Sequence, residues 1–119
     1  MSGAAGATSG KSNDGGVVAA EVRSEGSRAV VALRGELDMS GVPLVAAEVT
    51  GALARPGVTA VDLDLAAVTF LDSAGLNCLL KAQAEAAAAG IPLHVAAASP
   101  GVRRVVELAG VSDLVADPD

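Results

Sequence analysis

The chain has 119 residues, a net charge of −6 at pH 7, and 51% hydrophobic but only 1% aromatic residues. This length suits one domain with its own core, and the composition requires a core of Val, Leu and Ala with Phe70 as its only ring. The acidic balance excludes nucleic acid as a direct partner and disfavours an anionic membrane, because both need clustered Lys and Arg.

No apolar run approaches the roughly 20 residues of a membrane span. The first residues also lack the basic and apolar regions that are typical of a signal peptide. Cys78 is the only cysteine, which rules out an internal disulfide and fits a reducing compartment. We therefore expect a soluble, cytoplasmic protein that contacts no membrane.

The chain is predicted to open with a flexible tail and an antiparallel strand pair. Residues 1–16 are mostly Gly, Ala, Ser and Thr, with too little apolar surface to offset the entropy of ordering. Residues 17–23 and 28–34 are of strand type, and Ser24–Ser27 between them suits a hairpin loop of about four residues.

Three helices and two strands are predicted after this hairpin. Proline at a helix's first position and glycine after its last turn mark several of the boundaries. Residues 111–115 suit either a last strand or a loop. The predicted elements are a helix from Pro43 to Arg55, a strand 58–65, a helix from Asp72-Ser73 to about Ala89, a strand 91–97, and a helix from Ser99-Pro100 to Gly110.

The resulting order is β-β-α-β-α-β-α, which is typical of an α/β domain. Strand, helix, strand connections favour right-handed crossovers and parallel pairing, whereas the hairpin is antiparallel. The sequence therefore predicts a small mixed sheet of about four or five strands, covered by about three helices.

The stretch Val68–Leu76 joins an apolar run to a pattern with helical spacing. Either Asp72 or Ser73 can be the N-cap, since both carry an oxygen that accepts from backbone N–H groups of the first turn. Gly75 costs roughly 1 kcal/mol relative to alanine at a helical position. We interpret its bare backbone as room for another molecule to approach a nearby hydroxyl.

Two enzymatic or metal-binding alternatives have weak support. A serine hydrolase would need a base near Ser73, but His94 is the only histidine and no G-x-S-x-G elbow is present. Four acidic residues have oxygen ligands for a metal, but their spacing matches no known metal loop, and solvated carboxylates explain them equally well. They are Asp38, Asp62, Asp64 and Asp72.

A phosphorylation switch remains as the third use of these residues. A phosphate on Ser73 adds about −1.5 to −2 charges, which a helix N-terminus tolerates within the fold. Asp72 is adjacent, and we expect Asp38 and Asp64 at neighbouring loop ends. The phosphate would deepen a negative patch and repel a partner fitted to the bare hydroxyl.

The motifs, taken together, resemble the STAS-domain anti-sigma factor antagonists, also called anti-anti-sigma factors. The resemblance spans residues 17–116, and the separation of the first and third motifs makes it specific. The motifs are Gly35-Glu36-Leu37-Asp38, Asp64-Leu65, Val68–Leu76 and Leu108-Ala109-Gly110-Val111.

This resemblance implies a bacterial partner-switching protein that regulates transcription and is not itself an enzyme. Unmodified, it would bind an anti-sigma factor serine kinase and so release the sigma factor. The kinase would phosphorylate Ser73 and end binding, and a PP2C-type phosphatase would restore the hydroxyl. ATP and Mg²⁺ belong to the kinase, so no cofactor is expected here. Asp38, Asp72, Gly75 and Leu76 would lie at or beside the docking surface.

Ala74 departs from the family pattern, in which many members carry Ser or Thr at that position. The substitution makes Ser73 the only hydroxyl acceptor in the motif. The main rival interpretation is a constitutive STAS scaffold or lipid-transport accessory subunit without phosphorylation, in which Ser73 only caps its helix.

Overall fold

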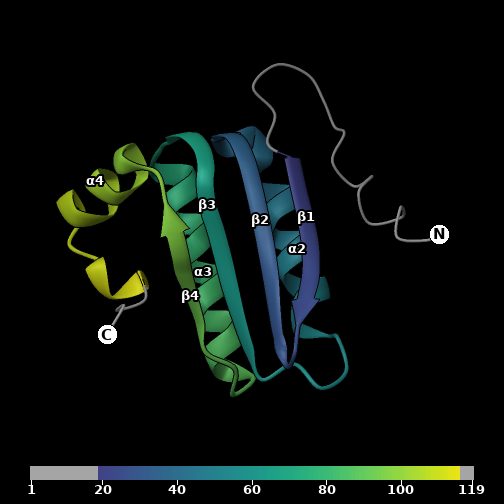
Figure 1. Ribbon diagram of the computed structural model, residues 1–119. Coiled ribbons are helices and arrows are strands. Elements are labelled where there is room, and N and C mark those ends of the chain that lie inside the picture. The colour runs from purple at the N-terminus through teal and green to yellow at the C-terminus, as the bar shows by residue number, and fades with distance from the viewer. Residues whose placement is uncertain (1–18, 116–119) are drawn as a thin grey trace.

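A hairpin of β1 (Ala19–Glu25) and β2 (Arg28–Leu37) opens the fold in the computed structural model, which describes residues 19–115 (Figure 1). Gly26 and Ser27 alone form its loop, so the prediction of about four loop residues was wrong. Gly26 has a φ of 65°, the backbone conformation that tight two-residue hairpins require. The expected tail 1–16 lies outside the described residues.

The sheet has four strands in the order β1-β2-β3-β4, with β2, β3 and β4 parallel, and the predicted element order and mixed α/β fold are confirmed. Helices α2 and α3 cover one face of the sheet, and α4 lies beyond β4 (Figure 1). The remaining elements are the 3-10 helix η1 (Met39–Gly41), α2 (Val42–Leu53), β3 (Ala60–Leu71), α3 (Ser73–Ala88), β4 (Leu93–Ala98), α4 (Pro100–Leu108) and the 3-10 helix η2 (Ser112–Leu114).

Strand β3 is longer than the sequence pattern indicated. It continues without a break from the predicted strand 58–65 into the apolar run that ends at Leu71. Its pairing with β2 slips between Ala32 and Arg34, and the Asp64 carboxylate accepts from the backbone N–H of Ala66 at 3.0 Å, at this irregularity. Asp64 is therefore a residue of the strand interior and not of a loop end.

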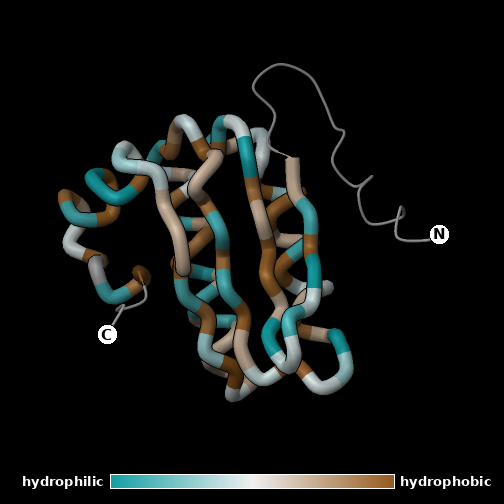
Figure 2. The backbone as a smooth tube through the Cα atoms, viewed as in Figure 1, coloured by the Kyte–Doolittle hydropathy of each residue, from teal (hydrophilic) through white to brown (hydrophobic). Residues whose placement is uncertain are grey.

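The core lies between the sheet and the helices and consists of Val, Leu and Ala, as predicted, together with Cys78. Hydrophobic and hydrophilic positions alternate along the strands (Figure 2). Phe70 is the exception to the predicted core: its side chain is 49% exposed. Val68 and Leu71 are buried on either side of it, so the simple alternation has broken down at this end of β3.

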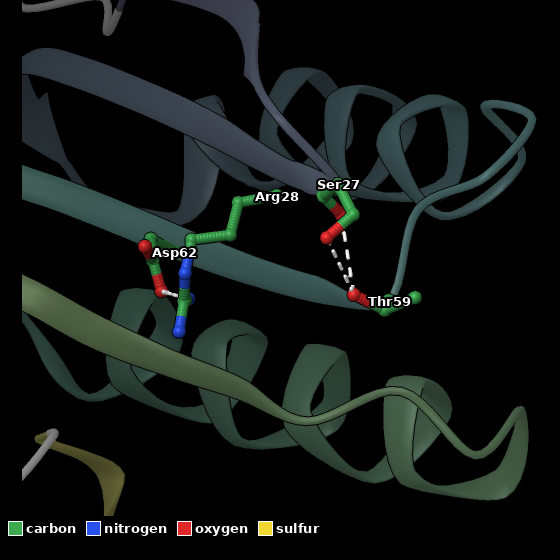
Figure 3. Close-up of polar contacts among 4 residues, drawn as sticks. All are labelled: Ser27, Arg28, Thr59 and Asp62. Atoms are coloured by element: carbon green, nitrogen blue, oxygen red, sulfur yellow. Dashed lines mark hydrogen bonds and ion pairs between the residues drawn. The ribbon is translucent and has the colours of Figure 1, made fainter.

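Polar contacts join the beginnings of β2 and β3 (Figure 3). The Arg28 guanidinium lies 2.8 Å from an Asp62 carboxylate oxygen, and the Thr59 hydroxyl donates to the Ser27 hydroxyl at 3.0 Å. The Thr59 backbone N–H also donates to the Ser27 carbonyl at 2.8 Å. These contacts fix the register of the parallel pair at the end opposite to Asp72.

Helix α4 begins and ends as the sequence predicts. Ser99 caps it, because its hydroxyl oxygen accepts from the backbone N–H of Val102 at 3.4 Å. Gly110 has a φ of 76°, and the Val111 N–H donates to the Val106 carbonyl. The segment left open as strand or loop contains η2 and a single parallel bridge from Val115 to β4.

Replacement of Ser99 by alanine tests how α4 is attached to the sheet. The Ser99 hydroxyl caps α4 and also donates to the Val68 carbonyl of β3 at 2.8 Å. We expect Ser99→Ala to lower the free energy of unfolding by about 2 kcal/mol in urea titrations. Ser99→Thr keeps the hydroxyl and should lose clearly less; equal losses would contradict this role.

Candidate functional site

The end of β2 and the start of α3 are held together at the carboxyl edge of the sheet. The backbone N–H of Asp72 donates to the Leu37 carbonyl at 3.3 Å. The Asp72 carboxylate accepts from the Gly75 N–H at 2.8 Å and caps α3. Of the two N-cap candidates, Asp72 therefore has this role, and the interpretation of Ser73 as a cap was wrong.

Ser73 is the first residue of α3, and its side chain is exposed. Among residues 19–115, no hydrogen bond occupies its hydroxyl group. The free backbone N–H groups of a first helical turn carry the positive end of the helix dipole. The structure thus combines an accessible hydroxyl with a backbone environment that stabilises negative charge.

Gly75 is explained by a contact within the fold, which corrects its interpretation as room for another molecule. It is buried, and a Cβ atom added to it would overlap the carbonyl oxygen of Leu37 and lie 2.9 Å from Leu71 Cδ1. Leu76, the next residue, is also buried. Gly75 and Leu76 therefore pack in the interior, beneath the exposed Ser73.

Asp38 follows β2 in the same way that Asp72 follows β3. Its carboxylate accepts from the backbone N–H of Ser40 at 3.0 Å and from the Ser40 hydroxyl at 2.7 Å. These hydrogen bonds lower the pKa of Asp38 below its ordinary value, and the bond from the Ser40 hydroxyl has the largest effect. Because β2 and β3 are parallel, the two carboxylates lie at one edge of the sheet.

Asp64 does not join this edge, although the sequence suggested that it would. It lies within β3, opposite Ala32 and Ala97. Eight residues of extended chain separate it from Asp72, a distance of about 25 Å at the usual rise of a strand. Of the three acidic residues expected beside Ser73, Asp38 and Asp72 therefore lie at this edge and Asp64 does not.

Two exposed apolar side chains, missed in the sequence, flank these groups. Met39 is 72% exposed at the start of η1, and Phe70 is 49% exposed near the end of β3. Large exposed apolar groups beside polar ones are typical of interaction sites. In the sequence, the alternation of apolar and polar residues along β3 breaks at Thr69–Phe70, and this break was the available signal for an exposed Phe70. We call Asp38, Met39, Phe70, Asp72 and Ser73 the Ser73 rim.

The arrangement argues against hydrolysis by a serine and histidine pair. His94 lies near the start of β4, where it pairs with Asp62, whereas Ser73 follows the other end of β3. Nine residues of strand separate Asp62 from Leu71, or about 30 Å. The only histidine of the chain is thus far outside the 2.6–3.2 Å reach that a general base needs.

Neither a metal cluster nor a membrane helix is found in residues 19–115. No group of three or more potential ligands comes together in this range. Asp62 is instead paired with Arg28. None of the helices in the same range has the length and apolar character to cross a bilayer. Cys78 is buried, and burial raises the pKa of its thiol above the ordinary value.

Comparison with known families agrees with this architecture. A family model described as "Mlab, STAS domain" matches residues 20–116. The chain belongs to the STAS domain family. Its sheet and its helix order are therefore those of a STAS domain.

Solved structures similar to this STAS domain include anti-sigma factor antagonists. The antagonist SpoIIAA in its unphosphorylated form is 25% identical, with a TM-score of 0.69 over 85% of this chain and 89% of that chain. An antagonist from Mycobacterium paratuberculosis is 28% identical, with a TM-score of 0.71 over 82% of each chain. The phosphorylated form of Bacillus SpoIIAA, 24% identical, shares the fold with a TM-score of 0.64 over 85% of this chain and 92% of that chain.

Alanine substitutions at Asp72 and Ser73 should separate the two adjacent residues. Asp72→Ala removes the cap of α3 and should lower the free energy of unfolding by about 1 kcal/mol. Ser73→Ala removes an exposed hydroxyl that has no hydrogen-bond partner among residues 19–115. It should change the free energy of unfolding by less than about 0.5 kcal/mol. Urea titrations of both variants measure the difference. A reversed order would contradict the assignment of the cap.

Gly75→Ala should destabilise the fold by about 2 kcal/mol or more, because its methyl group has no room beside the Leu37 carbonyl. Gly101→Ala is the matched control, since Gly101 also lies in the first turn of a helix but has nothing within 4 Å of an added Cβ. The free energy of unfolding of Gly101→Ala should rise by up to about 1 kcal/mol, because alanine has a higher helix propensity than glycine. Thermal and urea unfolding of both proteins give the comparison.

Proposed function

We propose that this STAS domain is an anti-sigma factor antagonist whose binding to an anti-sigma factor serine kinase is switched off by phosphorylation of Ser73. The observation that carries the proposal is the exposed hydroxyl of Ser73 at the first position of α3, left free because Asp72 caps the helix. The relatives named above as antagonists support the class of partner.

The chemistry of the switch follows from the composition of the Ser73 rim. The kinase transfers the γ-phosphoryl group of ATP to Ser73 Oγ, releasing ADP and the hydroxyl proton. The new group adds about −1.5 to −2 charges beside the carboxylates of Asp38 and Asp72. The helix N-terminus stabilises that charge within the domain, so the fold persists while the docking surface changes.

Met39 and Phe70 explain why the unmodified form binds. A partner that covers these apolar side chains removes the rim from water, and the neutral hydroxyl is easily included. A phosphate in the same place would lose its hydration beside the carboxylates of Asp38 and Asp72, at a high cost. Removal of the phosphate by a PP2C-type phosphatase restores binding, and the anti-sigma factor then releases its sigma factor in the bacterial cytoplasm.

A second candidate rests on the matching family model, whose description is not restricted to antagonists. In that case the domain is a constitutive scaffold or a lipid-transport accessory subunit, and Ser73 is an ordinary exposed residue. The two candidates differ in a single measurable property, the dependence of binding on charge at position 73.

The test uses each purified anti-sigma factor serine kinase of the source bacterium. Ser73→Ala should bind the cognate kinase within about threefold of the unmodified protein, whereas Ser73→Asp should weaken binding by at least about tenfold. Incubation with the kinase, ATP and Mg²⁺ should place one phosphate on Ser73, detected by mass spectrometry.

Ser27→Asp is the control, because it adds the same charge at the opposite end of the sheet and should leave binding unchanged. Equal binding by the Ser73→Asp variant and the unmodified protein, with no phosphate transferred, would support the scaffold instead.

A further inference from the structure

Strand β1 is an edge of the sheet, and among residues 19–115 no strand pairs with its outer side (Figure 1). One face of β1 is covered by α2, which packs against both β1 and β2. An uncovered edge strand presents a row of backbone N–H and C=O groups that a further strand can pair with.

The hairpin register determines which residues of β1 present these groups. Glu25 and Arg28 flank a two-residue loop as partners, so they exchange both of their hydrogen bonds. The register has no bulge, and inward and outward pairs therefore alternate along β1. It follows that Ala20, Val22 and Ser24 direct their backbone groups away from β2.

The side chains of β1 are arranged for pairing with an identical strand. If two copies pair antiparallel about a two-fold axis at Val22, Glu21 of each copy lies directly opposite Arg23 of the other. Both side chains are exposed in the single chain. These positions form non-hydrogen-bonded pairs, in which side chains approach most closely and opposite charges are stabilising.

A second layer of charges has the same symmetry. A hollow of about 200 Å³ lies between the edge of β1 and α2, lined by Val22, Glu48, Gly51, Ala52 and Arg55. Helix α2 connects two parallel strands and so runs in the same direction as β1. An axis at Val22 passes close to Gly51 and Ala52 and brings Glu48 of one copy toward Arg55 of the other.

The spacing of the two helices permits this contact. Each α2 lies over a β1–β2 pair, so the two helices would be two strand spacings apart, or about 10 Å. That separation is close to the usual distance between packed helices. An added Cβ on Gly51 would meet nothing within 4 Å, which leaves room on this face for the second helix. The Arg55 guanidinium, held on the Ser24 hydroxyl at 2.8 Å, already lies at the edge.

We propose that this edge is a homodimer interface, in which two copies join β1 to β1 antiparallel and form one continuous eight-stranded sheet. About the one two-fold axis, Glu21 of each copy faces Arg23 of the other. Glu48 of each copy likewise faces Arg55 of the other. The axis is perpendicular to the sheet, so the two Ser73 rims lie at opposite ends of the dimer and stay exposed.

The test is sedimentation velocity on the full 119-residue chain over a concentration series. The unmodified chain should show a concentration-dependent dimer. Glu21→Arg places positive charges at both positions 21 and 23, and Arg23→Glu places negative charges at both, while Glu25 at the end of β1 is unchanged. Each variant alone should dimerise at least about tenfold more weakly. An equimolar mixture should regain a heterodimer, and the double variant Glu21→Arg/Arg23→Glu should regain the homodimer.

Arg104→Glu on α4 is the control, because it changes charge on an exposed residue at the other side of the sheet and should leave dimerisation unchanged. Circular dichroism verifies that each variant is folded. A chain that stays monomeric at every concentration would overturn the proposal. So would a dimer that is insensitive to both single substitutions, or a mixture that fails to form the heterodimer.

Discussion

The carbonyl oxygen of Leu37 connects the end of β2 to the start of α3. It accepts from the Asp72 N–H and occupies the space that a side chain on Gly75 would need. The helix can reach this carbonyl only because residue 75 has no Cβ. This close approach brings the carboxyl ends of two parallel strands and the positive end of a helix to the same edge, and the proposed docking surface depends on it.

Around this contact, the roles of neighbouring residues are divided. Asp72 caps α3, Gly75 and Leu76 are buried below the surface, and Ser73 remains exposed. Because the cap is made by a different residue, a change at the Ser73 hydroxyl does not remove a hydrogen bond that the helix needs. The proposed phosphorylation of Ser73 would therefore leave the cap of α3 in place.

The two proposed surfaces use different physical means and lie in different parts of the domain. The Ser73 rim combines exposed apolar groups with a site of variable charge, which suits a partner that must leave. The β1 edge combines free backbone groups with fixed charges of both signs, which suits a second copy of the same chain. The polar contacts of Arg28 and Thr59 at the far end of β2 and β3 belong to neither surface and fix the strand register (Figure 3).

The sequence alone determined the order of the elements, the mixed sheet and the Asp-Ser-x-Gly-Leu start of α3, because caps, breakers and apolar spacing act between residues close in the chain. Tertiary structure decided what depends on distant neighbours. Gly75 is explained by Leu37, which lies in another strand. The irregular pairing of β3 leaves Phe70 exposed, and the length of that strand carries Asp64 away from the rim. Strand register, unlike a cap, is set by pairing across the whole sheet, and the local pattern at Thr69–Phe70 indicates only that the alternation breaks.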